Sequence, residues 1–103
     1  MADSLDRLYD AVLAAKGSDP VVSRTARLLR AGRAKIAKKL AEEAVEVVID
    51  AMHGNRDAVV NESADLIYNL VVLWVSSDVR PARNSRAVRE DAGSAVRAAM
   101  TAW

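Results

Sequence analysis

The 103-residue sequence contains no cysteine, no phenylalanine and only one histidine, and these gaps narrow the chemistry open to it. Without cysteine the chain forms no disulfide and offers no thiolate nucleophile or ligand. Because His53 is the only histidine, one chain cannot build a metal site from several imidazoles. Helix breakers are also scarce, with two prolines and four glycines. Alanine, valine and leucine dominate the apolar residues, which favours closely packed helices.

An excess of charge of one sign is missing as well. The 15 basic and 14 acidic residues leave a formal net charge of +1, which gives no argument for a nucleic-acid or membrane partner. Residues 1–7 lack the apolar segment of a secretory signal, and the uninterrupted apolar runs are too short to span a bilayer. We therefore expect one cytoplasmic domain over residues 1–103, with a core small enough to gain from pairing with a second copy.

Apolar residues at helical spacing predict two long helices in the middle of the chain. The first covers 33–53 and ends at Gly54-Asn55, and the second runs from 55 or 57 to about 77. Their connection is so short that they must lie antiparallel as neighbours. Residues 64–75 are apolar almost all round, which indicates burial on most sides and suggests a subunit interface.

The remaining segments predict shorter helices and complete an all-α class, an antiparallel helical bundle. A stripe of apolar residues predicts a helix over 4–16, with Ser4 as its N-cap. The segment 23–32 can be partly helical, and its conformation stays open. A divergent C-terminal helix is expected within about 82–103.

Two groups of carboxylates carry the functional argument: Glu42, Glu43 and Glu46 on one long helix, and Glu62 and Asp65 on the next. Residues three or four apart share a helix face, where like charges repel, so helix stability alone does not explain them. Glu46 lies about eight residues before the turn, and the second group lies about eight to ten after it. At a rise of about 1.5 Å per residue both groups reach the same height on the antiparallel pair.

Such an oxygen-only cluster suits Mg²⁺, or Mn²⁺, which typically bridges carboxylates to substrate phosphates. The predicted chemistry is hydrolysis of a phosphoanhydride, with a carboxylate outside the metal shell orienting the attacking water. The alternative is a solvated acidic face in salt bridges with Lys35, Lys38 and Lys39. Asn69, four residues after Asp65, can contact substrate or a metal-bound water, or can be a buried hydrogen-bonding residue.

Three motifs resemble the phosphoribosyl-ATP pyrophosphohydrolase family, an all-α nucleoside triphosphate pyrophosphatase group that includes the MazG proteins. They are Ser23-x-Thr25, then Lys35-Ile-x-Lys-Lys-x-x-Glu-Glu-Ala-x-Glu-Val-Val-Ile49, then Glu62-x-Ala-Asp-Leu-x-Tyr-x-Leu-x-Val-Leu73. The resemblance covers about 5–78, and the Arg- and Ala-rich tail from 80 onward departs from the pattern.

The resemblance implies a homodimer whose helices complete a four-helix bundle, and Mg²⁺-dependent hydrolysis of phosphoribosyl-ATP to phosphoribosyl-AMP and pyrophosphate, the second step of histidine biosynthesis. By motif position the metal ligands are Glu43, Glu46, Glu62 and Asp65, and Glu42 is a ligand or water-orienting residue. The expected substrate-binding residues, to which Asn69 is added for its spacing, are Ser23, Thr25, Lys35, Lys38, Lys39 and Asn69. Two other hypotheses remain open: a MazG-like housecleaning hydrolase of other nucleotides, and an inactive helical dimerisation module.

Overall fold

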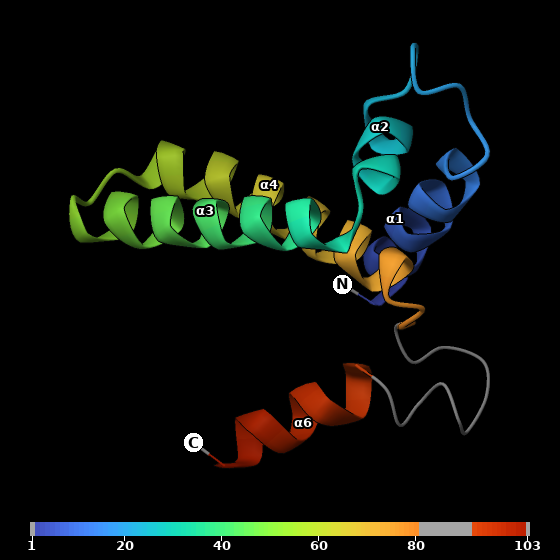
Figure 1. Ribbon diagram of the computed structural model, residues 1–103. Coiled ribbons are helices and arrows are strands. Elements are labelled where there is room, and N and C mark those ends of the chain that lie inside the picture. Colours follow the sequence, from blue (N-terminus) through green and yellow to red (C-terminus); the bar gives the residue numbers. More distant parts are fainter. Residues whose placement is uncertain (1, 81–91, 103) are drawn as a thin grey trace.

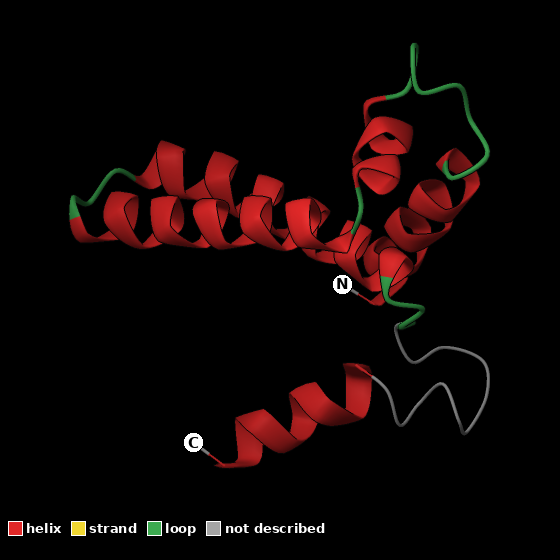
Figure 2. Ribbon diagram, viewed as in Figure 1, coloured by secondary structure: helices red, strands yellow, loops and turns green. Residues whose placement is uncertain are grey.

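The computed structural model describes residues 2–80 and 92–102, and this part of the chain consists of helices joined by turns (Figures 1 and 2). The helices are α1 (Ala2–Ala15), α2 (Arg24–Ala31), α3 (Arg33–Met52), α4 (Arg56–Ser76) and α6 (Ala92–Ala102). No strand occurs in the described ranges, which confirms the predicted all-α class.

The two long helices α3 and α4 form an antiparallel hairpin and lie side by side along most of their length (Figure 1). Gly54 turns the chain between them at φ +71°, a left-handed conformation that glycine adopts without strain. Asn55 caps α4, because its Oδ1 accepts a hydrogen bond from the amide of Ala58 at 3.1 Å. The predicted ends of both helices and their antiparallel packing are therefore confirmed.

The shorter helices α1 and α2 pack at the end of the hairpin opposite the Gly54 turn (Figure 1). There the N-terminus of α3 and the C-terminal half of α4 meet them in a core that buries Tyr9, with Tyr68 and Trp74 partly buried against it. Its buried members are Tyr9, Val12, Leu28, Ile36, Val71, Val72 and Val75. This core fixes α2 across the start of α3.

Two local predictions about these shorter helices are resolved. The first helix begins at Ala2, so Ser4 lies inside its first turn and the prediction that Ser4 caps it is wrong. The open segment 23–32 forms α2, and Ser23 caps it by accepting a hydrogen bond from the amide of Ala26 at 3.1 Å. A single residue, Gly32 at φ +96°, separates α2 from α3.

Burial along α4 agrees with the expectation for 64–75, where Ala64 and Asp65 are exposed and the other ten residues are buried or partly buried. Four of its residues are buried, whereas Val60 is 67% exposed near the turn. On α3 an apolar stripe (Val45, Val48, Ile49 and Met52, at positions i, i+3, i+4 and i+7 of one helix face) is also exposed, between 48% and 81%. The protein core therefore accounts for only one side of the hairpin.

By length and composition alone α4 could cross a membrane, with a mean hydropathy of 1.3 over its most apolar window. The core helix of a soluble protein meets the same criterion. In addition, Glu62 and Asp65 lie within α4, and carboxylates at bilayer depth carry a high energetic cost.

The C-terminal α6 packs against none of the other described helices (Figure 1). A helix was expected within about 82–103, and residues 92–102 form one. The stretch 82–91 of that prediction lies outside the described residues.

Candidate functional site

Three carboxylates converge midway along the α3–α4 hairpin. One oxygen each from Glu43, Glu62 and Asp65 lies within 4.8 Å of the other two. Glu43 comes from α3, and the other two come from α4. The juxtaposition follows from the antiparallel pairing, which brings residues on either side of the Gly54 turn to one height. We call these three residues the carboxylate cluster.

The crowding of carboxylates at the cluster disfavours the ionised form of Glu62 and so raises its pKa. Side-chain hydrogen bonds with Glu46 and then with Glu43, together with desolvation and repulsion from the same two carboxylates, raise the pKa of Glu62 to about 7. A proton on Glu62 supplies the donor that ionised carboxylates lack. The buried Oε2 of Glu43 has no hydrogen-bond partner among the described residues.

A hard divalent cation fits this arrangement. Mg²⁺ binds oxygen ligands, prefers few carboxylates, and keeps several waters that substrate phosphates can replace. The cation would be coordinated by the unpartnered oxygen of Glu43, and its positive charge would relieve the repulsion between the carboxylates around Glu62. Glu43 and Glu62 are partly buried and Asp65 is exposed, so one side of the cluster opens to solvent and can admit a substrate.

Two other predicted acidic residues lie at different distances from this cluster. Glu46 is close enough to share a hydrogen bond with Glu62, although it is exposed and is not one of the three converging carboxylates. Glu42 is exposed on α3 and also lies outside the trio. Their roles as ligand or water-orienting residue stay predictions.

Asn69 lies beneath the cluster and not on its open side. It is 1% exposed, and its Nδ2 donates a hydrogen bond to the backbone carbonyl of Asp65 at 2.8 Å. Its own Oδ1 has no partner in the described part of the chain. This geometry matches the buried hydrogen-bonding alternative and positions the backbone of Asp65, and direct substrate contact by Asn69 stays a prediction.

The expected substrate loop is tied to α4 beside the cluster. The hydroxyls of Thr25 and Tyr68 share a hydrogen bond of 2.6 Å, and the guanidinium carbon of Arg24 lies 5.6 Å from the centroid of the Tyr68 ring. Ser23 uses its hydroxyl to cap α2. Thus Thr25 and Ser23 both hold α2 in place, whatever further contact they make with substrate.

The predicted lysines divide into two groups. Lys35 and Lys39 line a groove of about 230 Å³ between α2 and α3, whereas Lys38 is exposed and is not among the residues that line it. The other lining residues, which the sequence analysis did not single out, come from one face of α2: Arg24, Arg27, Leu28 and Ala31. We call this groove, with its four cationic side chains, the basic groove. The spacing of Arg24 and Arg27 on a helix was visible in the sequence, but their meeting with α3 depends on how α2 packs.

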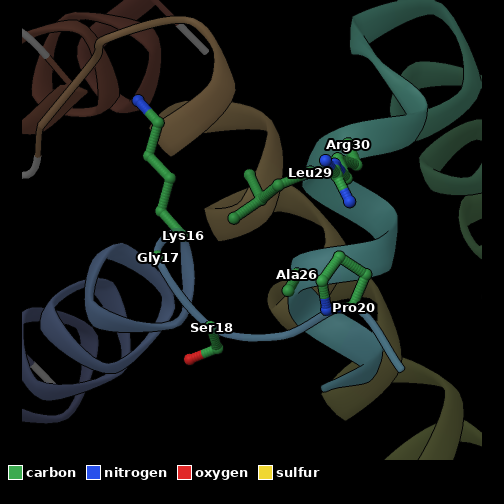
Figure 3. Close-up of a pocket in the computed structure, with 7 residues that line it drawn as sticks. All are labelled: Lys16, Gly17, Ser18, Pro20, Ala26, Leu29 and Arg30. Carbon is green, nitrogen blue, oxygen red and sulfur yellow. The ribbon is translucent and has the colours of Figure 1, made fainter. Parts of the chain in front are cut away.

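A larger pocket, of about 400 Å³, lies on another side of α2 (Figure 3). Its lining residues are Lys16, Gly17, Ser18, Pro20, Ala26, Leu29 and Arg30. None of these is a carboxylate, and none belongs to α3 or α4. Pocket volume alone therefore does not identify the candidate site, and the converging carboxylates are the better guide.

Comparison with known proteins agrees with the motifs. The family model described as phosphoribosyl-ATP pyrophosphohydrolase matches residues 5–92 and so runs beyond the 5–78 stretch recognised in the sequence. "Phosphoribosyl-ATP pyrophosphatase 2" of Rhodopseudomonas palustris is 72% identical over 81 residues, which are 79% of this chain and 62% of that protein. The protein of the same name from Bradyrhizobium diazoefficiens is 69% identical, over 79% of this chain and 60% of its own length.

A third relative covers more of its own length. "Phosphoribosyl-ATP pyrophosphatase" of Azospirillum brasilense is 55% identical over 78 residues, which are 76% of this chain and 70% of the relative. Against the first two relatives the chain spans only about three fifths of their length. From the matched family model and these identities, the chain belongs to the phosphoribosyl-ATP pyrophosphohydrolase family.

Proposed function

We propose that this chain hydrolyses a phosphoanhydride of phosphoribosyl-ATP, giving phosphoribosyl-AMP and pyrophosphate in histidine biosynthesis. The observation that carries the proposal is the convergence of Glu43, Glu62 and Asp65 from two helices onto one point beside an open surface. The names of the relatives supply the substrate. A biosynthetic role of this kind agrees with the expected cytoplasmic location.

We expect the carboxylate cluster to hold Mg²⁺, with Mn²⁺ as a substitute. When bound, the ion would neutralise phosphate oxygens and lower the pKa of a bound water. The protein's own contribution is to fix three oxygens before the ion arrives, which requires Glu62 to give up the proton that its raised pKa retains near pH 7.

In the proposed reaction a water oxygen forms a bond to phosphorus while the bond to the pyrophosphate oxygen breaks. The proton of that water passes to a carboxylate. Glu46 is the best placed of the remaining acids for this role, because it lies next to Glu62 without being one of the three converging ligands. Pyrophosphate then leaves with the electron pair of the broken bond.

We also propose that two copies associate through the hairpin. The apolar stripe on α3 and the nearby Val60 leave large aliphatic side chains in solvent, and no helix within 2–80 or 92–102 covers them. Pairing two hairpins about a twofold axis buries both stripes and makes a four-helix bundle.

The test is a pyrophosphate-release assay with phosphoribosyl-ATP, ATP and a panel of common and damaged nucleoside triphosphates. We expect turnover of phosphoribosyl-ATP with Mg²⁺, restoration by Mn²⁺, and loss in chelator. Release of pyrophosphate from other triphosphates but not from phosphoribosyl-ATP would refute the proposal that phosphoribosyl-ATP is the substrate. No release from any nucleotide would refute the hydrolase itself and leave a dimerisation module.

A further inference from the structure

The basic groove has an electrostatic character that the carboxylate cluster does not explain. Arg24 and Arg27 from α2 line it together with Lys35 and Lys39 from α3, and no carboxylate of the described residues lines the groove. Four cations around a space of about 230 Å³ repel one another unless an anion lies between them. The groove is therefore matched to an anionic ligand.

Its arginines are already held in place. The Arg27 guanidinium donates hydrogen bonds to the backbone carbonyls of Pro20 and Val21, at 2.9 and 3.2 Å. Arg24 rests over the Tyr68 ring. Neither contact neutralises the positive charge, so both arginines keep a cation in a fixed position. Because these side chains are already ordered, an anionic ligand loses less free energy to side-chain ordering when it binds.

Two independent connections place the groove next to the carboxylate cluster. Along α3, Lys39 precedes Glu43 by four residues and so shares its face one turn away. Along α4, Tyr68 under Arg24 follows Asp65 by three residues. With a rise of about 1.5 Å per residue, the groove lysines lie about 6 and 12 Å from the level of Glu43 along the helix axis.

One molecule bound at the cluster can thus reach the groove with a second anionic group. Phosphoribosyl-ATP carries such a group, because its added ribose bears a phosphate monoester that ATP lacks. A phosphate monoester is close to a dianion at neutral pH, and the planar guanidinium of arginine pairs with two of its oxygens. The groove's chemistry and its place beside the cluster fit that group.

We propose that the basic groove binds the ribosyl phosphate of the substrate and so selects phosphoribosyl-ATP over ATP. This inference rests on the proposed function for its substrate. Lys35 and Lys39 then act on the phosphate far from the bond that breaks. Arg24 and Arg27 join them as specificity-determining residues.

The kinetic test compares Arg24→Gln and Lys35→Gln with Arg30→Gln. Arg30 is a matched control, because it lies on α2 too but lines the pocket of Figure 3. Loss of a charge-assisted contact should lower kcat/KM for phosphoribosyl-ATP about tenfold in each groove variant. The Michaelis or inhibition constant of ATP should stay within about twofold, and Arg30→Gln should change neither.

The pattern of these constants can overturn the inference. An equal loss with ATP and phosphoribosyl-ATP would assign the groove to the polyphosphate, and unchanged phosphoribosyl-ATP kinetics in both groove variants would remove it from substrate binding. Arg24→Lys keeps the positive charge but loses the planar guanidinium that can pair with two phosphate oxygens. If the fold is intact, this variant should therefore retain part of the preference for phosphoribosyl-ATP over ATP.

A binding measurement without turnover separates this inference from the proposed function. In chelator, ribose 5-phosphate should shift backbone amide resonances between residues 24 and 39, whereas ribose should not. Arg24→Gln and Lys35→Gln should abolish these shifts, and added salt should weaken them. Shifts elsewhere only, or shifts that survive in both variants, would refute the groove as a phosphate site even if the enzyme proves active.

Discussion

Glu62 is the residue on which the charge of the site depends. Its neighbours Glu46 and Glu43 raise its pKa to about 7, far above the ordinary 4.5 of a glutamate. The folded protein therefore binds a proton there at pH values where the unfolded chain has released it. A metal ion held as proposed would compete with this proton for the same oxygens, so Mg²⁺ affinity should increase as the pH rises through 7.

The same shift sets a pH dependence of stability in the absence of metal. Since the folded pKa is raised, the stabilisation from Glu62 is fully present below pH 4.5 and is lost as the pH rises through about 7. We expect the melting temperature in chelator to fall between pH 5 and pH 8, and Glu62→Gln to flatten this slope. Glu42→Gln should keep the slope, and an unchanged slope in Glu62→Gln would contradict the assignment.

Removal of a converging ligand should remove the metal's effect on both activity and stability. Glu43→Gln should lower kcat/KM with Mg²⁺ by at least about a hundredfold, more than the loss of a residue that only supports a metal ligand. Wild-type protein should melt at a higher temperature when Mg²⁺ is added, because the ion binds the folded state. A Glu43→Gln variant that keeps this Mg²⁺-dependent increase in a thermal melt would exclude Glu43 as a ligand.

The residues that meet at the site could be predicted from the sequence where the packing of a single helix pair decides which side chains are neighbours. Counting from the Gly54 turn was enough to bring Glu43, Glu62 and Asp65 together, and the structure confirms that they meet. Counting could not separate these three from Glu46, because side-chain rotamers decide which oxygens converge. It also missed Arg24, whose place over Tyr68 depends on tertiary packing.

Among the elements, the hairpin has a local device that can be tested by itself. Asn55 caps α4, and Asn55→Ala should lower the free energy of unfolding by about 1 kcal/mol in a denaturant titration. Asn61→Ala is the matched control at an exposed position inside α4, where alanine is the better helix former. Equal effects of the two substitutions would show that the cap contributes nothing.

The C-terminus of α3 and the N-terminus of α4 were predictable because Gly54 and Asn55 mark them in the local sequence. The conformation of α2 was not, since eight residues form a marginal helix in isolation. What stabilises it is the Ser23 cap, the burial of Leu28 and the hydroxyl contact between Thr25 and Tyr68. Two of these three are tertiary, and a pattern along the chain does not contain them.

For the whole molecule, the exposed apolar stripe on α3 predicts self-association. Val48→Asp should convert a dimer to a monomer in light scattering after gel filtration, because it puts a carboxylate into the proposed interface. Val21→Asp is the control, since Val21 is 81% exposed in the loop before α2 and outside the stripe. A wild-type monomer, or a Val48→Asp dimer, would contradict the proposed assembly.

The sequence expectation for α4 shows the limit of arguments from one chain. An apolar pattern predicts that a helix face is buried, but it does not say whether the same chain or another copy of the chain buries it. Val71, Val72 and Val75 are covered by the protein's own α1 and α2 region, whereas Val60 is exposed. The same residue types thus have different surroundings along one helix.

Gly32 has a consequence for how substrate preference can change within this fold. The arginines of the basic groove belong to α2 and its lysines to α3, and this one residue, at φ +96°, connects the two helices. The backbone torsion angles of this residue, together with the packing of α2 against α4, therefore set the spacing between the two rows of cations. Adjusting that spacing would alter which phosphate-bearing molecules fit the basic groove, with every charged side chain left as it is.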